Sequence, residues 1–376
     1  MLFSALSSLL SKASKLDVLG RLALFYLVLK LVKALKAMSS SKHLLPRTEL
    51  ALGAVDPHPH AHAYYRHFQP SADRNLWLFS TWWLPAANVK AWKGVIFIVH
   101  GFNEHISRYE HVGRFLSAHG YAVFGMDHQG HGLSEGDPLY IERFTDYIAD
   151  YRQFMHHVLG LASDSPYALQ TNMHIPKGTE LKTLPRFVLG HSMGVVITVL
   201  TVQKSPEIDW TGVILSAGAM KVDPVTAPWH LRFLARVLSS VLPKLRLPDD
   251  GFPHLSNNPL VYQRARRDPL CHKTGFTPRW AHEFFTSCDL ALAEAPKFKH
   301  DVLLFHGDKD VIAFPSGSQE FYEKAASTNK TLHMLEGRQH ELLNEDDHED
   351  MLRTILDWCA KQAREKAATG LVDVAA

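Results

Sequence analysis

Residues 186–200 constrain the fold more than any other part of the chain. The apolar run 187–189 is typical of a buried strand, and the apolar run 195–200 is typical of a buried helix. Between them, residues 190–194 read Gly-His-Ser-Met-Gly, a G-x-S-x-G motif. A sharp turn from strand to helix is the setting that this motif needs, and it exposes the hydroxyl of Ser192 at the carboxyl end of a sheet. Alone, the motif also fits an ordinary Gly/Ser turn, so the rest of the chain decides its meaning.

Other apolar runs predict a sheet to which this turn belongs. Residues 94–100 and 121–126 are apolar without alternation, which is typical of parallel strands buried on both faces. A helical stretch at about 106–118 separates them, so the three form a strand–helix–strand unit. Further strands are predicted at 76–84, 212–216, 302–305 and 331–335. The sequence therefore predicts an α/β fold with its site outside the carboxyl ends of the strands.

Two polar loops follow directly after these strands. Residues 100–105 read His-Gly-Phe-Asn-Glu-His, and residues 127–136 read Asp-His-Gln-Gly-His-Gly-Leu-Ser-Glu-Gly. In this order, and together with residues 190–194, they resemble the α/β-hydrolase superfamily, most closely its monoacylglycerol lipase and lysophospholipase branch. The resemblance covers about residues 75–360, and the 127–136 loop is its most specific part. The chain departs from the pattern at Val195, where relatives usually have Gly or Ala for close packing of helix on strand.

The resemblance implies a mostly parallel sheet flanked by helices and a catalytic triad. Ser192 would be the nucleophile, and the acid would lie in the loop after strand 302–305, where Asp310 fits the family pattern better than Asp308. The base would follow the last strand, where His340 matches the family's E-G-x-x-H pattern. His333 lies inside that strand and His348 begins the C-terminal helix, at about 347–365. The order Ser, Asp, His is that of this fold.

Each implied residue has a chemical reason to be there. A serine hydroxyl is a poor nucleophile near neutral pH, so Ser192 needs His340 to accept its proton. Asp310 would fix the imidazole tautomer and stabilise its positive form. The backbone N–H groups of Met193 and Phe102 would bind the oxyanion. Glu104 would approach the polar part of the substrate, which rests on the resemblance only.

A change of pattern after residue 223 predicts a helical insertion. Apolar residues recur at helical spacing over 229–245, and strand signals are missing from there to about residue 294. The resemblance implies a lid at about 225–294 that forms an apolar tunnel for an acyl chain. The alternative is that these apolar faces only pack on the core.

We interpret 161–184 as a surface loop and 75–365 as the hydrolase domain. The segment Asp268-Pro269-Leu270 recurs in the branch and is expected to be structural.

Residues 1–45 form a basic, apolar N-terminal segment. Its charge-free core, 22–29, is far shorter than the ~20 residues that span a bilayer. A helix here would place five lysines within one third of its circumference (Lys12, Lys15, Lys30, Lys33 and Lys36). This pattern favours a helix that lies on or shallowly in a membrane surface. A transit peptide and an amphipathic helix packed on the body are the alternatives. Residues 46–74 are interpreted as a linker or surface segment.

Charge and cysteine content exclude several functions. Residues 1–42 hold seven basic side chains and one acidic, so the rest of the chain has 33 basic and 37 acidic residues. An acidic body argues against binding to nucleic acid. The three cysteines, none in a C-x-x-C pair, suggest no disulfide framework and fit a reducing compartment. The histidines show no zinc-site spacing, so we expect no metal and no cofactor.

Together these features predict a serine hydrolase that acts on a lipid ester. Monoacylglycerol is the first substrate choice and lysophospholipid the second, and other carboxylesterases, peptidases and acyltransferases would use the same residues. An epoxide hydrolase or dehalogenase is disfavoured, since those carry Asp in place of Ser192. A non-catalytic binding protein on the same fold is the alternative from another class. We expect an intracellular protein on an internal membrane or lipid droplet, and the sequence leaves the oligomeric state open.

Overall fold

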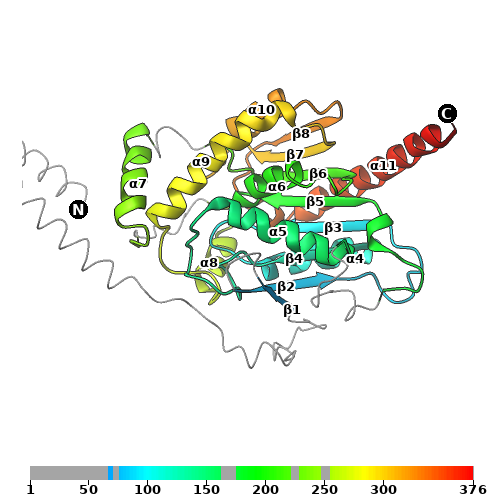
Figure 1. Cartoon of the computed structure of the whole chain (residues 1–376), viewed down its shortest axis with the longest axis horizontal. Helices are drawn as coiled ribbons and strands as arrows, with labels where there is room; N and C mark the ends of the chain where they lie inside the picture. Colours follow the sequence, from blue (N-terminus) through cyan, green and yellow to red (C-terminus); the bar gives the residue numbers. More distant parts are fainter. Residues whose placement is uncertain (1–66, 71–75, 162–174, 222–227, 247–254, 376) are drawn as a thin grey trace, which may run out of the picture.

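The computed structural model describes residues 67–70, 76–161, 175–221, 228–246 and 255–375, and these build one eight-stranded sheet in the order β1-β2-β4-β3-β5-β6-β7-β8. Strand β2 is antiparallel to both of its neighbours, and the pairs from β4 to β8 are all parallel (Figure 1). The strands are β1 (His67–Pro70), β2 (Trp77–Trp83), β3 (Gly94–Val99), β4 (Tyr121–Met126), β5 (Arg186–His191), β6 (Gly212–Ser216), β7 (Val302–Gly307) and β8 (Lys330–Leu335).

The predicted α/β fold with a mostly parallel sheet is confirmed. Strands β3, β4, β6 and β7 are buried along their whole length, as their unbroken apolar sequences predict. Strand β1 lies within residues 46–74, which the sequence suggested to be linker or surface segment, and there it adds a four-residue strand to the edge of the sheet. The predicted N-terminal segment, 1–45, lies outside the described residues.

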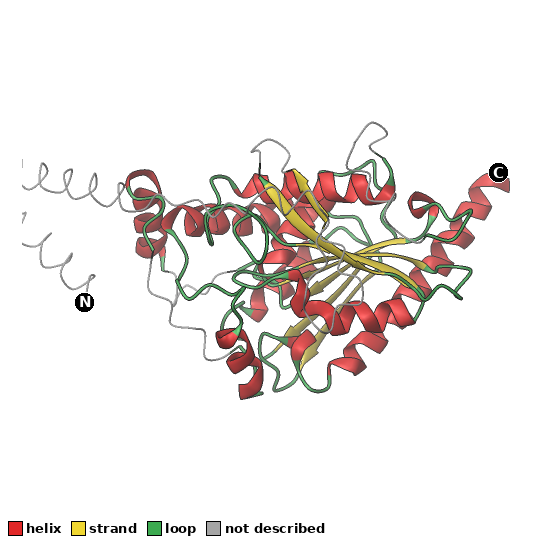
Figure 2. Cartoon of the chain, turned by 90° about the horizontal axis from the view of Figure 1, so that it is seen from below, coloured by secondary structure: helices red, strands yellow, loops and turns green. Residues whose placement is uncertain are grey.

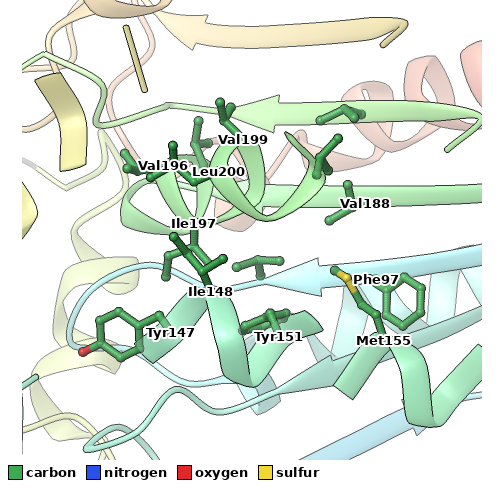
Figure 3. Close-up of a cluster of buried hydrophobic side chains, with 14 of the residues drawn as sticks. Phe97, Tyr147, Ile148, Tyr151, Met155, Val188, Val196, Ile197, Val199 and Leu200 are labelled. Carbon is green, nitrogen blue, oxygen red and sulfur yellow. The ribbon is translucent and has the colours of Figure 1, made fainter. Parts of the chain in front are cut away.

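Helices cover both faces of the sheet (Figures 1 and 2). Strand side chains on one face pack with helices α5, α6, α9 and α10, and those on the other face pack with α4 and α11. Figure 3 shows part of the first layer, where Ile148 of α5 lies beside Ile197 of α6, and Met155 of α5 lies beside Phe97 of β3. The bounds are α4 (Glu110–Ala118), α5 (Phe144–Leu159), α6 (Met193–Gln203), α9 (Pro278–Glu294), α10 (Pro315–Lys324) and α11 (His348–Ala375).

The described residues between β6 and β7 form three α-helices, in the region predicted as a helical insertion. They are α7 (Trp229–Val241), α8 (Pro259–Arg267) and α9. Helix α7 packs against α9 but leaves an apolar stripe open, with Trp229 80%, Phe233 61%, Val237 43% and Val241 39% exposed. Among the described residues, none of the helices is both long and apolar enough to cross a membrane.

Candidate active site

The turn between β5 and α6 holds Ser192 in an unusual backbone conformation. Its φ is 53° and its ψ is −120°, outside the regions that a residue with a side chain prefers. Such strain costs of the order of 1–3 kcal/mol and persists only where the surroundings enforce it. Here the Ser192 N–H donates to Ser216 O at 3.0 Å, and the Ser192 carbonyl accepts from Ala219 N–H at 3.2 Å. The end of β6 therefore fixes the position of the serine.

The two glycines of the motif are required by space. A Cβ on Gly194 would lie 2.1 Å from the carbonyl oxygen of Val99, and a Cβ on Gly190 would lie 2.6 Å from Thr198 Oγ1. Helix α6 can therefore start close to β3 and β5 only with glycine at both positions. This close start brings Ser192 to the carboxyl ends of the central strands.

Val195 fits this packing because the residue opposite it, Gly218, has no side chain. Its side chain is fully buried, and a Cβ on Gly218 would come within 2.8 Å of Val195 Cγ1. Gly218 lies in the β6 loop that binds Ser192 through Ser216 and Ala219. The side chain of Val195 is thus accommodated by the missing side chain at Gly218.

The structure brings His340 and Asp310 into direct contact. His340 Nδ1 lies 2.7 Å from Asp310 Oδ2, and Asp310 Oδ1 accepts from the N–H groups of Ile312 and Ala313 at 2.9 Å each. An ionised Asp310 only accepts, so the proton lies on His340 Nδ1 and Nε2 is left for a substrate or nucleophile. Asp308, the other candidate acid, instead accepts from Gly337 N–H.

The charges of this pair reinforce each other. Burial opposes ionisation of Asp310, but the adjacent His340 and His306 outweigh it and hold the pKa of Asp310 below its usual range. Burial likewise opposes charging of His340, yet Asp310 raises its pKa above 6.5, with help from Glu341 and Glu104. A base whose positive form is stabilised in this way is suited to accept a proton from a serine.

His306 supports the acid and was not assigned a role from the sequence. Its Nε2 lies 3.2 Å from Asp310 Oδ2 and 2.8 Å from the carbonyl oxygen of Ala313, while its Nδ1 bonds to Ser318 Oγ at 2.7 Å. With both ring nitrogens occupied, His306 holds the Asp310 loop in place. The only sequence signal was its place near the end of a predicted strand, beside the loop of the acid.

The predicted nucleophile, Ser192, and the predicted base, His340, are not hydrogen-bonded to each other in this structure. The described residues include no hydrogen bond between Ser192 Oγ and His340, although the ring of His191, next to the serine, lies 4.9 Å from the His340 ring. Ser192 is 9% exposed and His340 is 3% exposed. Catalytic hydrogen bonds in structures without substrate are often long or poorly aligned and tighten when substrate binds.

The predicted oxyanion donors flank Ser192. Met193 begins α6, so its backbone N–H has no partner within the helix. A Cβ on Gly101 would lie 3.0 Å from Ser192 Cβ, which places the 100–102 loop against the serine. The ring of Phe102 packs against that of Trp280 of α9, with the ring centroids 3.9 Å apart and the planes tilted by 35°. One predicted donor therefore lies at the start of α6, and the other lies in the 100–102 loop that packs against the serine.

The histidine-rich loop 127–136 supports the 100–102 loop through hydrogen bonds. His128 N–H donates to His100 Nε2 at 3.0 Å, and His128 Nε2 donates to the carbonyl of His100 at 2.8 Å. Burial lowers the pKa of His128 to about 4, and it also lowers the pKa values of His100 and His131. These histidines are neutral near pH 7, and their contacts are structural.

Glu104, predicted as a substrate contact, is buried beneath the same loop. Its Oε1 accepts from Gly101 N–H and from Tyr109 OH at 2.8 Å, and its Oε2 lies 3.3 Å from Arg108 Nε. Glu104 also borders a cavity of about 60 Å³, together with Phe102, Arg108 and Glu341. Its side chain thus supports the 100–102 loop, and contact with substrate stays a prediction.

Two other features lie away from the predicted triad. Ligand atoms of His105, Asp268 and Cys271 fall within 4.8 Å of one another, but His105 Nε2 already bonds to Asp268 Oδ2 at 2.9 Å, joining the 100–105 loop to the insertion. A cavity of about 280 Å³ borders Phe305, Leu342 and Met351 and includes none of the predicted catalytic side chains.

Comparison with known proteins identifies the family. Residues 90–347 match the family model described as serine aminopeptidase, S33. The chain belongs to this family. It is therefore a serine hydrolase of the α/β-hydrolase superfamily, and the resemblance seen in the motifs is confirmed.

The similar proteins include several named as lipases. The chain is 31% identical over 269 residues to human monoglyceride lipase, covering 72% of this chain and 81% of that protein. It is 28% identical over 267 residues to monoacylglycerol lipase of Mycolicibacterium smegmatis, covering 71% and 88%.

Solved structures have the same fold. The monoacylglycerol lipase of Paleococcus ferrophilus matches with 25% identity and a TM-score of 0.62, covering 76% of this chain and 99% of that one. A soluble variant of monoglyceride lipase from Saccharomyces cerevisiae, in complex with a substrate analog, matches with 20% identity and a TM-score of 0.68, covering 82% and 99%. At that identity the yeast structure supports the fold alone.

Proposed function

We propose that this serine hydrolase cleaves the ester bond of a monoacylglycerol to give a fatty acid and glycerol. The observation that carries the chemistry is the 2.7 Å contact between His340 and Asp310 beside the strained turn of Ser192. The relatives named monoglyceride or monoacylglycerol lipase support the substrate class. The family resemblance supports each residue in the role that its motif predicts.

The reaction would proceed through an acyl-enzyme. His340 Nε2 takes the proton of Ser192 while the serine oxygen attacks the ester carbonyl, and Asp310 stabilises the positive imidazole. The backbone N–H groups of Met193 and Phe102 stabilise the oxyanion. His340 then gives its proton to the departing glycerol oxygen, and water, activated by the same base, releases the fatty acid. Apart from the ester and the water that hydrolyses the acyl-enzyme, each step uses only side chains and backbone groups of this chain.

A lysophospholipid is the second candidate substrate. Arg266 and Lys273 border the cavity beside Phe102 and Glu104, so cationic groups lie near the place proposed for the polar part of the substrate. A phosphate headgroup would be attracted there, whereas glycerol would gain only hydrogen bonds. A serine peptidase or an acyltransferase would use the same triad and differ in the leaving group or acceptor.

We also propose that helices α7 to α9 form a lid and that α7 faces a lipid surface. Residues 228–246 and 255–294 lie between β6 and β7, and Trp280 of α9 reaches the ring of Phe102 beside the nucleophile. The exposed stripe of Trp229, Phe233 and Val237 is unusual for water-facing side chains and suits insertion into lipid. The basic N-terminal segment, 1–45, would be a second point of membrane contact. This arrangement would bring the enzyme to a substrate that dissolves in bilayers.

The test of function is release of fatty acid by the purified chain, with a monoacylglycerol and a lysophosphatidylcholine of the same acyl chain side by side. Ser192→Ala is the control for the mechanism. Faster, Ser192-dependent release from the monoacylglycerol is expected. Release from the lysophospholipid alone would move the substrate to the second candidate. No Ser192-dependent release from either lipid, together with an unreactive Ser192, would favour the non-catalytic binding protein.

A further inference from the structure

The loop of the catalytic base carries a second buried carboxylate directly after His340. Glu341 is 5% exposed, and its Oε2 accepts from Asn344 and lies 3.3 Å from Arg108 Nη2. Its Oε1 lies 4.0 Å from Nε2 of His191, whose ring faces that of His340. His191, which directly precedes Ser192, thus lies near both Glu341 and His340.

Arg108 connects this carboxylate to the oxyanion loop. Its guanidinium lies 3.3 Å from Glu341 on one side and 3.3 Å from Glu104 Oε2 on the other. Glu104 in turn accepts from the N–H of Gly101. A single buried cation therefore bridges the loop that carries His340 and the loop that carries Phe102. The two carboxylates and one guanidinium have a net negative charge when both acids are ionised.

The negative charge of this cluster resides mainly on Glu341. Burial and the neighbouring Glu341 raise the pKa of Glu104 to about 7, so Glu104 carries a proton for part of the neutral range. Burial also opposes ionisation of Glu341, but Arg108 and the nearby histidines outweigh it and lower its pKa. When Glu104 is protonated, the charges of Glu341 and Arg108 balance, and removing either partner would leave the other as a costly uncompensated buried charge.

We propose, on the basis of the proposed function, that Glu341 is a positioning residue of the catalytic base. Its carboxylate holds the His340 loop against Arg108 and supplies a second negative charge, beyond Asp310, that favours the positively charged form of His340. The charged and titratable groups around His340 come from four parts of the chain. They are Asp310 after β7, His191 at the end of β5, Glu104 and Arg108 after β3, and Glu341 itself.

The test is the pH dependence with which a fluorophosphonate inactivates the full-length protein through Ser192. This reaction needs the base but no particular lipid, so it remains informative if the substrate assignment is wrong. Its acidic limb follows the pKa of His340, because only the neutral imidazole can accept the serine proton. Glu341→Gln keeps the shape and most hydrogen bonds of the side chain but removes its charge.

The expected result for Glu341→Gln has a characteristic pH signature. Loss of the negative charge makes His340 easier to deprotonate, so the acidic limb moves to lower pH. On the alkaline plateau the rate falls about 3- to 10-fold, because a weaker base is a poorer proton acceptor. At pH values below the acidic limbs of both proteins, the larger neutral fraction of His340 in the variant offsets its weaker basicity. The variant there approaches the wild-type rate. A residue that only maintained structure would lower the rate by the same factor at every pH.

Two matched variants separate charge from packing. Glu341→Asp keeps the charge and should keep the acidic limb at the wild-type pH. Glu345→Gln removes a buried carboxylate from the same loop, one that accepts from Ser256 at 2.8 Å and does not contact the base, and it should also leave the limb unchanged. An acidic limb in Glu341→Gln at the wild-type pH would overturn the proposal. So would equal losses in Glu341→Gln and Glu341→Asp at every pH.

The design also covers misfolding and failure of the proposed function. If Glu341→Gln has no cooperative melting transition, Arg108→Gln is compared with the double variant Arg108→Gln/Glu341→Gln. The double variant lacks both charges, so no buried guanidinium is left without its carboxylate partner. The double variant should then have its acidic limb at lower pH than the single one, and coincident limbs would overturn the proposal. A wild-type protein that is not labelled at Ser192 would overturn both proposals. A labelled protein that releases no fatty acid would overturn only the function.

Discussion

The pairing of Val195 with Gly218 gives a sharp prediction about the turn that carries Ser192. In Gly218→Ala, the new methyl group would lie 2.8 Å from Val195 Cγ1 and 3.3 Å from its Cβ. Ordinary carbon contacts lie at about 3.5–4.0 Å, so one of the two backbones must move by roughly 0.7 Å. Because Val195 is fully buried at the start of α6, the expected loss of stability is about 1–3 kcal/mol, as for other overpacked cores.

The same displacement should reach the active site. Ala219, next to Gly218, donates its N–H to the carbonyl of Ser192. A shift of this size at a nucleophile can lower the rate by about 10-fold or more, since a misplacement of about 1 Å can cost 10²-fold. The assay is urea unfolding for stability, with the rate of fluorophosphonate labelling for the serine. The sign of both effects is fixed: Gly218→Ala should be less stable and slower.

The matched control is to remove the clashing side chain. Val195→Ala alone loses two buried methyl groups, worth about 1.6 kcal/mol at ~0.8 kcal/mol each. Combined with Gly218→Ala, it makes room for the added methyl, so the double variant should be more stable than the sum of the single changes by about 0.5–3 kcal/mol. Strictly additive effects, or a Gly218→Ala protein as stable as wild type, would refute the reasoning.

Three further predictions concern the acid, the buried histidines and α7. Asp310→Asn should lower kcat by about 10³–10⁴-fold by favouring the wrong tautomer of His340, while Asp308→Asn should stay near wild type; equal losses in kcat assays would count against this assignment. The pKa of His128 is lowered in the folded protein, so its contribution to the free energy of unfolding is present above the unfolded-state pKa near 6.5 and is lost as the pH falls towards about 4. Urea unfolding at stepped pH should detect this loss. Phe233→Ser should weaken sedimentation with lipid vesicles without changing labelling of Ser192, and unchanged sedimentation would remove α7 from the membrane contact.

The sequence predicted the central strands well because each is buried on both faces. An unbroken apolar run such as residues 94–99 fits few structures other than a central parallel strand, and its ends are marked by polar loops. Strand β1, His-Phe-Gln-Pro, has neither a long apolar run nor clear alternation, so no signal separated it from the surrounding segment. Its formation depends on pairing with β2, which is a tertiary effect.

The apolar pattern of α7 predicted a helix but not which face would be covered. Periodicity indicates that the apolar side chains share one side, and the sequence contains no information on what lies opposite. In the structure, α9 covers part of that side, while Phe233 and Val237 face outwards. Which element packs on a helix face depends on where the flanking segments place the helix in the fold. That placement is determined by tertiary contacts and not by the local sequence.

Motifs located the proposed catalytic residues, whereas their supporting contacts come from packing. Ser192 and His340 follow patterns that repeat within a family, and local sequence is enough to find them. The Arg108–Glu341 contact joins residues 233 positions apart, and no short pattern encodes it. His306 likewise contacts Asp310 only because β7 and the following loop fold back on each other. Sequence motifs therefore identify the reacting groups better than the groups that tune them.

The contacts of the histidines around the site determine which one can act as the base. His100 and His128 bond to each other's backbone, and burial leaves them neutral. His306 contacts the acid, but Ser318 and Ala313 occupy its two nitrogens. His340 alone among these four bonds to Asp310 through Nδ1 while its Nε2 makes no hydrogen bond to another described residue. A base needs both a stabilised positive form and a free nitrogen, and of these four only His340 has the two together.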